Sequence, residues 1–534
     1  MKSTPQKITL QAIGLFACAL ILFTIGLANQ EIVGFEARFY VFALDAWEHG
    51  LSWFPVSYNQ PYPDYPVTST ALIYLSSLLF GHLSKFTAVF PSAVAAAITV
   101  AYTFLIGALR EPRWGWFAVF FLLLTNTFVR EARTISPDQY IAMVTTVCFY
   151  LAYSAQLSQK HFRLIGIPVL FLIGFACRGP IGVVIPAGVI FAFYALEKNV
   201  RYLFLASLAA LLVLAIGIAA LWYAAYHVGG SAFVNDVWRM QVSGRMVDAQ
   251  LPWYFYFSES LGAYAITFPL ALFVLLGGGR EFFSKKVSLD VQFLQKLLAW
   301  ALIILVGLSI PAGKKIRYIL AMSPALALIC AYVFIAPSSK KYFYYLSRGV
   351  YSICYLLPLV CLVFMSVIYF SNAKEILNNV SMLGLMGIFL FLQAAIVIFT
   401  RYFKEYSALI AVLAAALVFI ISYVGIVEKI NIELNRTRDF VAAVEAVRIA
   451  RNADLVFVKE NPDGLPIKYI ADMTTSEKPV FLNTNRELIH YPFKSIFIIS
   501  VENYNQLPKA VARLFVIDQS GKIGREPIVV LKRK

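Results

Sequence analysis

Charged residues are scarce in this chain. Only 14% of the 534 residues are charged, whereas 60% are hydrophobic, and a soluble protein of this length needs a more polar surface. All six cysteines lie in apolar stretches, so neither a disulfide framework nor a thiolate metal site is indicated. The sequence also lacks a glycine-rich nucleotide-binding loop, a zinc-ligand spacing and an internal repeat. The composition is that of a membrane protein.

Long apolar runs recur along the chain from Ile8 onward. Most have roughly the 17–25 residues that a helix needs to cross the hydrocarbon layer of a bilayer. The pattern therefore predicts a polytopic α-helical membrane protein. We predict thirteen transmembrane spans, at 8–27, 86–109, 114–129, 138–157, 163–177, 180–196, 202–226, 259–277, 292–311, 318–335, 350–370, 381–400 and 406–427.

The basic residues predict the orientation of these spans. Lys2 and Lys7 precede the first apolar run, which is longer than the roughly 7–15 residues of a signal peptide, so an uncleaved span is preferred. Cations are more numerous on the connections that share a side with the N-terminus, which places that end in the cytoplasm. Thirteen crossings then put the C-terminus outside, in the periplasm of a bacterial inner membrane. The net charge of +16 thus reflects topology rather than nucleic-acid binding.

Two segments depart from the pattern of short connections. The long outer loop 28–85 is rich in acidic residues, and its apolar stretch 67–80 is too short for a comfortable span, which indicates a helix lying at the membrane interface. Residues 428–534 have a soluble composition, with helical periodicity over 437–451. Five short runs there are typical of buried strands and predict a small α/β domain: LVFVKE, PVFLN, SIFIISV, RLFVID and PIVVLK. We divide the chain into a transmembrane domain, 1–427, and a periplasmic domain, 428–534.

Several basic residues lie in tight connections on the predicted outer face, where ionisable groups are functional candidates. Each can be a snorkelling side chain, and together they can be a patch for anionic lipids. Their gathering at one membrane level favours an anion site, and phosphate suits both the guanidinium fork and the compact ammonium charge. These cations are Arg130 and Arg133 in FVREARTISPD, Arg178 in RGPIG, Arg245 in a longer loop, and Lys314, Lys315 and Arg317 in KKIRY.

Three outer carboxylates are candidates for the chemistry: Glu36, Asp64 and Asp138. A carboxylate opposite a phosphate site can act as a general base that takes a proton from an attacking hydroxyl. Glu36 and Asp64 can equally hold a divalent cation such as Mg²⁺ or Mn²⁺, and no other cofactor is indicated. Asp138 can instead be a helix N-cap that forms an ion pair with Arg133. Prolines on both sides of Asp64 stiffen its backbone.

An ordered set of motifs resembles a known group of enzymes. The motifs are FEARFY followed by DAWEHG, PDYPVTSTALIYLSSLLFG, REARTISPD, CRGPIGVVIP and KKIRYILAMSPALALI. In this order they resemble the GT-C class of membrane glycosyltransferases, and within it the lipid A aminoarabinose transferase and protein O-mannosyltransferase-like superfamily. The resemblance implies the GT-C fold.

The resemblance also implies a reaction, in which a sugar passes with inversion from a polyprenyl-phosphate carrier to an acceptor on the outer face. Cations placed in advance stabilise the charge that develops on the departing phosphate. The residues implied in holding that phosphate are Arg133, Arg178, Lys314, Lys315, Arg317 and Tyr318, with Arg38, Arg130 and Arg245 as further candidates.

The chain departs from the family pattern at two positions. Phe35 stands where the family has its first acidic residue, and Tyr65 stands where it has a lysine. The base is therefore Glu36 or Asp64, the identity of the sugar stays open, and a divergent or inactive member is an alternative.

Other functions fit part of the pattern. A transporter or flippase could bind the same lipid phosphate without transferring a sugar, although such proteins are often built from repeats. A scaffold whose outer domain binds an envelope partner is a third alternative. If the chain is a transferase, its acceptor can be lipid A, another glycolipid, a polysaccharide or a protein.

Overall fold

The computed structural model describes residues 5–64, 66–244, 251–282, 287–337, 340–371, 380–473, 475–492 and 494–534. By its internal contacts the chain divides into two compact units. The helical unit comprises Met1–Ile25, Asp64–Pro66 and Val89–Val427, and the mixed unit comprises Gly26–Pro63, Val67–Ala88 and Glu428–Lys534. The predicted boundary between residues 427 and 428 assigned the first outer loop to the transmembrane domain, whereas most of that loop lies in the mixed unit.

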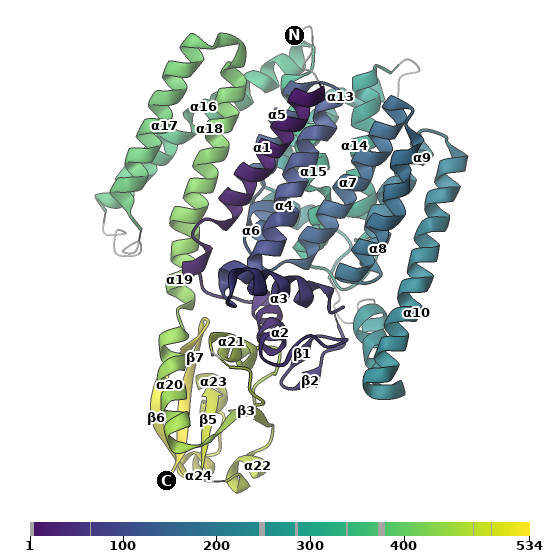
Figure 1. Ribbon diagram of the computed structural model, residues 1–534. Coiled ribbons are helices and arrows are strands. Elements are labelled where there is room, and N and C mark those ends of the chain that lie inside the picture. The colour runs from purple at the N-terminus through teal and green to yellow at the C-terminus, as the bar shows by residue number, and fades with distance from the viewer. Residues whose placement is uncertain are drawn as a thin grey trace. The chain divides into compact units, whose positions relative to one another are not determined.

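Long helices that run side by side form the helical unit (Figure 1). Those in its first half are α1 (Pro5–Thr24), α4 (Lys85–Ala108), α5 (Pro112–Leu123), α6 (Asn126–Ala132), α7 (Pro137–Ser158), α8 (Gly166–Arg178), α9 (Ile181–Leu196) and α10 (Val200–Trp238). Those in its second half are α12 (Phe255–Ala263), α13 (Thr267–Phe282), α14 (Leu289–Gly307), α15 (Ser323–Ala331), α16 (Lys341–Tyr369), α17 (Met382–Tyr402) and α18 (Ser407–Ser422).

The helices confirm a multi-pass membrane protein, with differences from the predicted spans. Within the described ranges, ten helices are long and apolar enough to cross a membrane, or eleven if the bent pair α12 and α13 counts as one span. The predicted span 180–196 corresponds to α9, a shorter apolar helix. The predicted span 114–129 is divided between α5 and α6, because the helix ends at Leu123 and a new one begins at Asn126.

The interior of the helical unit is built around α15. Every residue of this helix is buried, and it packs against α5, α13 and α14. A helix that is apolar on all sides is stable only when other helices surround it. The 3₁₀ turn Ile316–Met322 leads directly into α15, so the basic KKIRY motif lies at the end of the most enclosed helix.

Glycines allow α8 and α9 to cross closely. An ideal Cβ on Gly182 would lie 1.9 Å from the carbonyl oxygen of Gly174, and a Cβ on Gly174 would lie 2.1 Å from that of Gly182. Even one methyl group would therefore separate the two backbones. Since Arg178 is the last residue of α8, the close crossing of the two helices fixes its position.

The C-terminal part of the mixed unit contains a five-stranded sheet of order β4-β3-β5-β7-β6. β4, β3 and β5 are parallel, whereas β7 is antiparallel to β5 and β6. The predicted α/β character is thus confirmed. The strands are β3 (Asp454–Val458), β4 (Val480–Leu482), β5 (Ser495–Ser500), β6 (Phe515–Ile523) and β7 (Glu526–Arg533), and the helices are α19 (Glu428–Asn435), α20 (Arg438–Arg451), α21 (Leu465–Asp472), α22 (Asn485–His490), α23 (Val501–Asn505) and α24 (Lys509–Ala512).

The first outer loop supplies the rest of the mixed unit. It forms α2 (Phe35–His49), α3 (Thr68–Phe80) and a small hairpin of β1 (Val56–Ser57) and β2 (Gln60–Pro61). Val41 and Leu44 of α2 lie in the same buried apolar cluster as Leu455 of β3 and Ile467 of α21. The loop after the first predicted span and the chain after the last one therefore share a core.

The glycine crossing gives a testable prediction. We expect Gly182→Ala to lower the stability of the protein by at least about 2 kcal/mol, because the added methyl group overpacks two backbones that cannot separate without moving α8 and α9. Thermal unfolding in detergent measures the effect. Gly14→Ala in α1 is the matched control, since its Cβ would meet no atom within 4 Å, and it should not lower the melting temperature. Equal melting temperatures for the two variants would contradict this account.

Candidate functional site

Asp138 lies at the centre of a buried charged cluster. Its Oδ1 is 3.1 Å from Nε of Arg178, and its Oδ2 is 3.1 Å from Nε of Arg317. Asp138 and Arg178 are both buried. One carboxylate thus holds two guanidinium groups, and the three side chains together keep a net positive charge. The contact with Arg178 is a hydrogen bond and that with Arg317 is an ion pair, so the buried carboxylate offsets part of the charge of both arginines.

Tyr318 joins the two arginines on a second side. The guanidinium carbon of Arg178 lies 5.6 Å from the centre of the Tyr318 ring, and that of Arg317 lies 5.8 Å from it. Both distances are within the range of a cation–π interaction. The structure therefore brings together Asp138, predicted as a catalytic residue or as the partner of Arg133, with Arg178, Arg317 and Tyr318 of the predicted phosphate site.

Local sequence places Arg178 at this point. It is the last residue of α8, where the helix dipole favours a cation. Gly179 then adopts φ +68° and ψ −150°, a conformation that glycine tolerates and other residues rarely do, and Pro180 precedes the next helix. The Arg-Gly-Pro sequence thus ends one helix and starts another within two residues.

Asp64 belongs to the same unit as this cluster. The side-chain amide of Gln241 donates a hydrogen bond to the backbone carbonyl of Asp64. A Cβ on Gly179 would lie 3.1 Å from Oε1 of the same glutamine, so Gln241 lies between Asp64 and the residue that follows Arg178. Asp64 is half-buried. Its neighbour Tyr65 lies outside the described residues.

The two lysines of the KKIRY motif have different surroundings. Lys314 is buried and its Nζ donates to the backbone carbonyl of Leu251 at 3.1 Å. Lys315 is exposed, and its backbone N–H donates to the hydroxyl oxygen of the buried Tyr256 at 3.3 Å. Tyr256 therefore fixes the backbone just before Arg317.

Other predicted site residues have different partners. The terminal nitrogens of Arg133 donate to the carbonyls of Leu22 and Ile25, at 2.7 and 2.8 Å. These carbonyls belong to the C-terminal end of α1, where backbone acceptors lack partners within the helix. Arg133 thus binds α1, and its predicted role in holding the carrier phosphate has no support from these contacts.

Glu36 lies in the mixed unit and forms an ion pair with Lys85. Its side chain is 3% exposed, and that of Lys85 is 2% exposed. Glu36 also accepts a hydrogen bond from the backbone N–H of Val33 at 2.9 Å, at the start of α2. Its charge is therefore neutralised within the protein, which disfavours its predicted role as a base.

The structure gives partners for two of the three remaining candidate cations. Arg38 forms an ion pair with Asp463 at 2.9 Å within the mixed unit. Arg130 is 41% exposed and pairs with the adjacent Glu131 at 3.0 Å. Arg245 lies outside the described residues. Among residues whose placement is described, no group of three or more His, Cys, Asp or Glu side chains could hold a metal ion.

An apolar cavity of about 350 Å³ begins at Pro180, two residues after Arg178 in the chain. It shares Pro180 and Gln241 with the surroundings of Arg178, and Trp222 and Trp238 lie on its wall. The cavity forms because α10 is bent at Gly229 and Gly230, so that its second part faces its first. Sequence reasoning assigned no role to Gln241 or Tyr256, since neither belongs to a charged motif. An apolar cavity next to a cationic cluster fits a molecule with a lipid chain and an anionic head.

Comparisons with known proteins agree with this architecture. Residues 64–223 match the family described as dolichyl-phosphate-mannose-protein mannosyltransferase. The fold is similar to the crystal structure of ArnT from Cupriavidus metallidurans bound to undecaprenyl phosphate, with a TM-score of 0.73 and 15% sequence identity over 98% of each chain. The apo structure of the same protein gives a TM-score of 0.72, with the same identity and coverage. No curated protein matches the chain in sequence. These matches confirm the GT-C fold and the resemblance to GT-C glycosyltransferases that the motifs indicated.

The Glu36–Lys85 pair gives a prediction that separates a structural from a catalytic role. We expect Glu36→Gln to destabilise the protein by about 3–5 kcal/mol, because it leaves a buried ammonium without its counter-charge. The double variant Glu36→Gln, Lys85→Met removes both charges and should restore most of the stability. Thermal unfolding of the single and double variants measures the coupling. Stability that is unchanged in the single variant would contradict the structural role.

Proposed function

We propose that the protein is an integral-membrane glycosyltransferase that moves a sugar from a polyprenyl-phosphate carrier to an acceptor hydroxyl. The observation that carries the proposal is the Asp138 carboxylate shared by Arg178 and Arg317 beside an apolar cavity. ArnT from Cupriavidus metallidurans, which has the same fold, was crystallised with undecaprenyl phosphate. The match to the mannosyltransferase family includes Asp64, Asp138 and Arg178.

The cationic cluster would act on the leaving group. In the transfer, the acceptor oxygen bonds to the anomeric carbon while the bond from that carbon to the phosphate oxygen breaks. The bonding electrons leave with the phosphate, which gains negative charge. Arg178 and Arg317, held in place by Asp138 and Tyr318, stabilise that charge without having to reorganise during the reaction. Lys314 and Lys315 add positive charge from the same motif.

Asp64 is the better candidate for the base that takes the acceptor's proton. It is half-buried, it lies in the helical unit, and its backbone is held by Gln241. Glu36 belongs to the other unit and is paired with Lys85. The role of a divalent cation at these two carboxylates has no supporting cluster among the residues that the structure describes.

Contacts within the mixed unit support the proposed topology. Arg38 of the first loop binds Asp463, and Glu48 accepts a hydrogen bond from the backbone N–H of Ser476 at 2.8 Å. Residues that touch in this way must lie on the same side of the membrane. The chain must then cross the membrane an even number of times between the first loop and the C-terminal segment. With the first span added, the total number of crossings is odd, as in the predicted thirteen. We propose that this side is the periplasm of a bacterial inner membrane.

The acceptor is a hydroxyl-bearing envelope molecule: lipid A, another glycolipid, a polysaccharide or a protein. A lipid transporter or flippase is the second candidate, and one observation favours it. α12 and α13 meet at an angle of 111°, and interrupted helices often form transport sites. Movement of the carrier lipid across liposomes without any sugar product would support that candidate.

The arginines give the first test of the transferase. In liposomes with a radiolabelled polyprenyl-phosphate sugar, we expect Arg178→Gln and Arg317→Gln each to lower the transfer rate by about 100-fold or more, because each removes a preformed charge from the leaving group. Arg178→Lys keeps the charge and should retain part of the activity.

Arg348→Gln is the matched control. Arg348 is an exposed arginine of α16 that donates to the Tyr344 hydroxyl at 2.8 Å, so its loss should leave transfer unchanged. Thermal unfolding of every variant separates lost chemistry from lost folding. Transfer at the normal rate in both stable glutamine variants would overturn the proposed phosphate site.

The base gives a second test. We expect Asp64→Asn to lower kcat by about 10²–10⁴-fold, the usual contribution of a general base, while leaving the affinity for undecaprenyl phosphate unchanged. The double variant Glu36→Gln, Lys85→Met should retain transfer, since those residues form a structural pair. If the double variant is stable but inactive while Asp64→Asn is fully active, Asp64 is not the base.

A further inference from the structure

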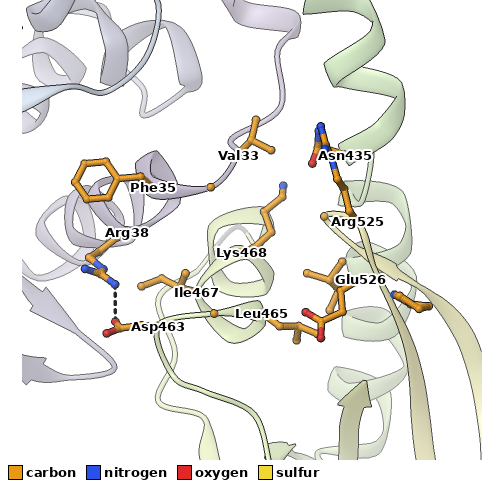
Figure 2. A pocket seen from close by; sticks show the side chains of 15 residues that line it. Val33, Phe35, Arg38, Asn435, Asp463, Leu465, Ile467, Lys468, Arg525 and Glu526 are labelled. Atoms are coloured by element: carbon orange, nitrogen blue, oxygen red, sulfur yellow. Dashed lines mark ion pairs between the residues drawn. The ribbon is translucent and has the colours of Figure 1, made fainter. Parts of the chain in front are cut away.

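The mixed unit contains a cavity of about 730 Å³ that the proposed transfer chemistry does not use. It lies among the start of α2, the end of α19, the start of α21 and the turn between β6 and β7 (Figure 2). A volume of this size is typical of sites for small molecules. Polar side chains from all four segments line it: Arg38, Asn435, Asp463, Lys468, Arg525 and Glu526.

One end of the pocket carries nitrogen donors. Figure 2 shows Asn435, Lys468 and Arg525, from three different elements, directed toward the same end. Asn435 is buried and donates to the carbonyl of Asn431 at 2.7 Å, which holds its amide in place. The Lys468 ammonium is held 2.6 Å from both oxygens of Asp472 and 3.5 Å from Oε2 of Glu31, so its charge is already compensated.

Arg525 supplies the uncompensated charge at this end. It lies in the two-residue turn of the β6–β7 hairpin, where Ile523 pairs with Glu526. Gly524 has φ +61°, which permits so tight a turn. The hairpin therefore presents Arg525 from a short, well-defined turn. Within the ranges that the structure describes, Arg525 forms no ion pair.

Acceptors line other parts of the pocket. The Glu526 side chain reaches solvent, and partial desolvation together with the carboxylates of Glu460 and Glu502 raises its pKa above the usual range. On another wall, Asp463 is held by Arg38 at 2.9 Å. The apolar side chains of Leu465 and Ile467 complete the lining. Donors at one end, carboxylate acceptors elsewhere and an apolar wall suit a ligand with one anionic group and several hydroxyls.

We propose that this pocket binds an anionic saccharide, with its phosphate or carboxylate at Arg525, Asn435 and Lys468 and its hydroxyls at Glu526 and Asp463. A guanidinium binds either kind of anion through paired N–H donors, and the carboxylates accept from sugar hydroxyls. Identifying this saccharide as part of the acceptor rests on the proposed glycosyl transfer. The binding itself does not.

The test is equilibrium binding to the full-length protein in detergent, measured by titration calorimetry. The probes are glucose 6-phosphate, glucuronate, glucose and inorganic phosphate. We expect at least one of the two anionic sugars to bind more tightly than glucose and phosphate, because only such sugars engage both ends of the pocket. The relative affinity of glucose 6-phosphate and glucuronate shows whether the pocket prefers a phosphate or a carboxylate. Arg525→Gln should weaken binding of the preferred sugar at least tenfold, and Glu526→Gln should weaken it less.

Arg513→Gln is the matched control, because Arg513 is an exposed arginine of the same unit that does not line the pocket. It should leave the affinity unchanged. Arg317→Gln should also leave it unchanged, since that residue lies in the helical unit. Equal affinity in the wild type and the stable Arg525→Gln protein would overturn the proposal, as would binding that is lost in Arg317→Gln but kept in Arg525→Gln. If the protein binds the saccharide in a manner that depends on Arg525 but shows no transferase activity, the proposed pocket is upheld and the proposed glycosyl transfer is refuted.

Discussion

The sharing of one buried carboxylate by two arginines is the interaction on which the candidate site depends. Asp138 lies in the first turn of α7, Arg178 ends α8 and Arg317 lies in the 3₁₀ turn before α15, so a single side chain joins three segments that are far apart in the sequence. Two guanidinium groups this close would repel each other in a medium of low dielectric constant. The carboxylate removes most of that repulsion but leaves an excess of positive charge, which is what a lipid phosphate requires.

A second constraint shapes the other unit. The apolar face of α2 cannot be stable in water, and it is buried in the same core as β3 and α21. The ion pairs of Arg38 with Asp463 and of Lys468 with Glu31 add polar contacts between the same segments. The segment after the first helix is thus a structural part of the C-terminal domain. The cavity proposed to bind a saccharide lies within this composite body, and neither segment alone would form it.

The predictions that held are those in which local chemistry suffices. The apolar runs became helices, the runs rich in β-branched residues became strands, and the stretch 67–80 became α3. The charges that proved to be paired were harder to interpret. Glu36 finds its partner 49 residues away in Lys85, and Arg133 finds the end of α1 more than a hundred residues away. From sequence alone, Glu36 resembles a catalytic base and Arg133 a member of an anion site, because no local pattern shows which partner the fold brings near.

The sequence by itself determined the class of this protein. Its apolar runs require a membrane and its motifs resemble GT-C glycosyltransferases. Its tight basic connections predict one anion site that contains Arg178 and Arg317, but they predict Arg133, Lys314 and Lys315 in the same site as well. Only the tertiary structure decided that these two arginines share Asp138, that Glu36 is neutralised by Lys85, and that Gln241 holds Asp64. The reason is physical: hydrophobicity and helix-ending signals act between near neighbours in the chain, whereas the partner of a buried charge is set by how distant helices pack.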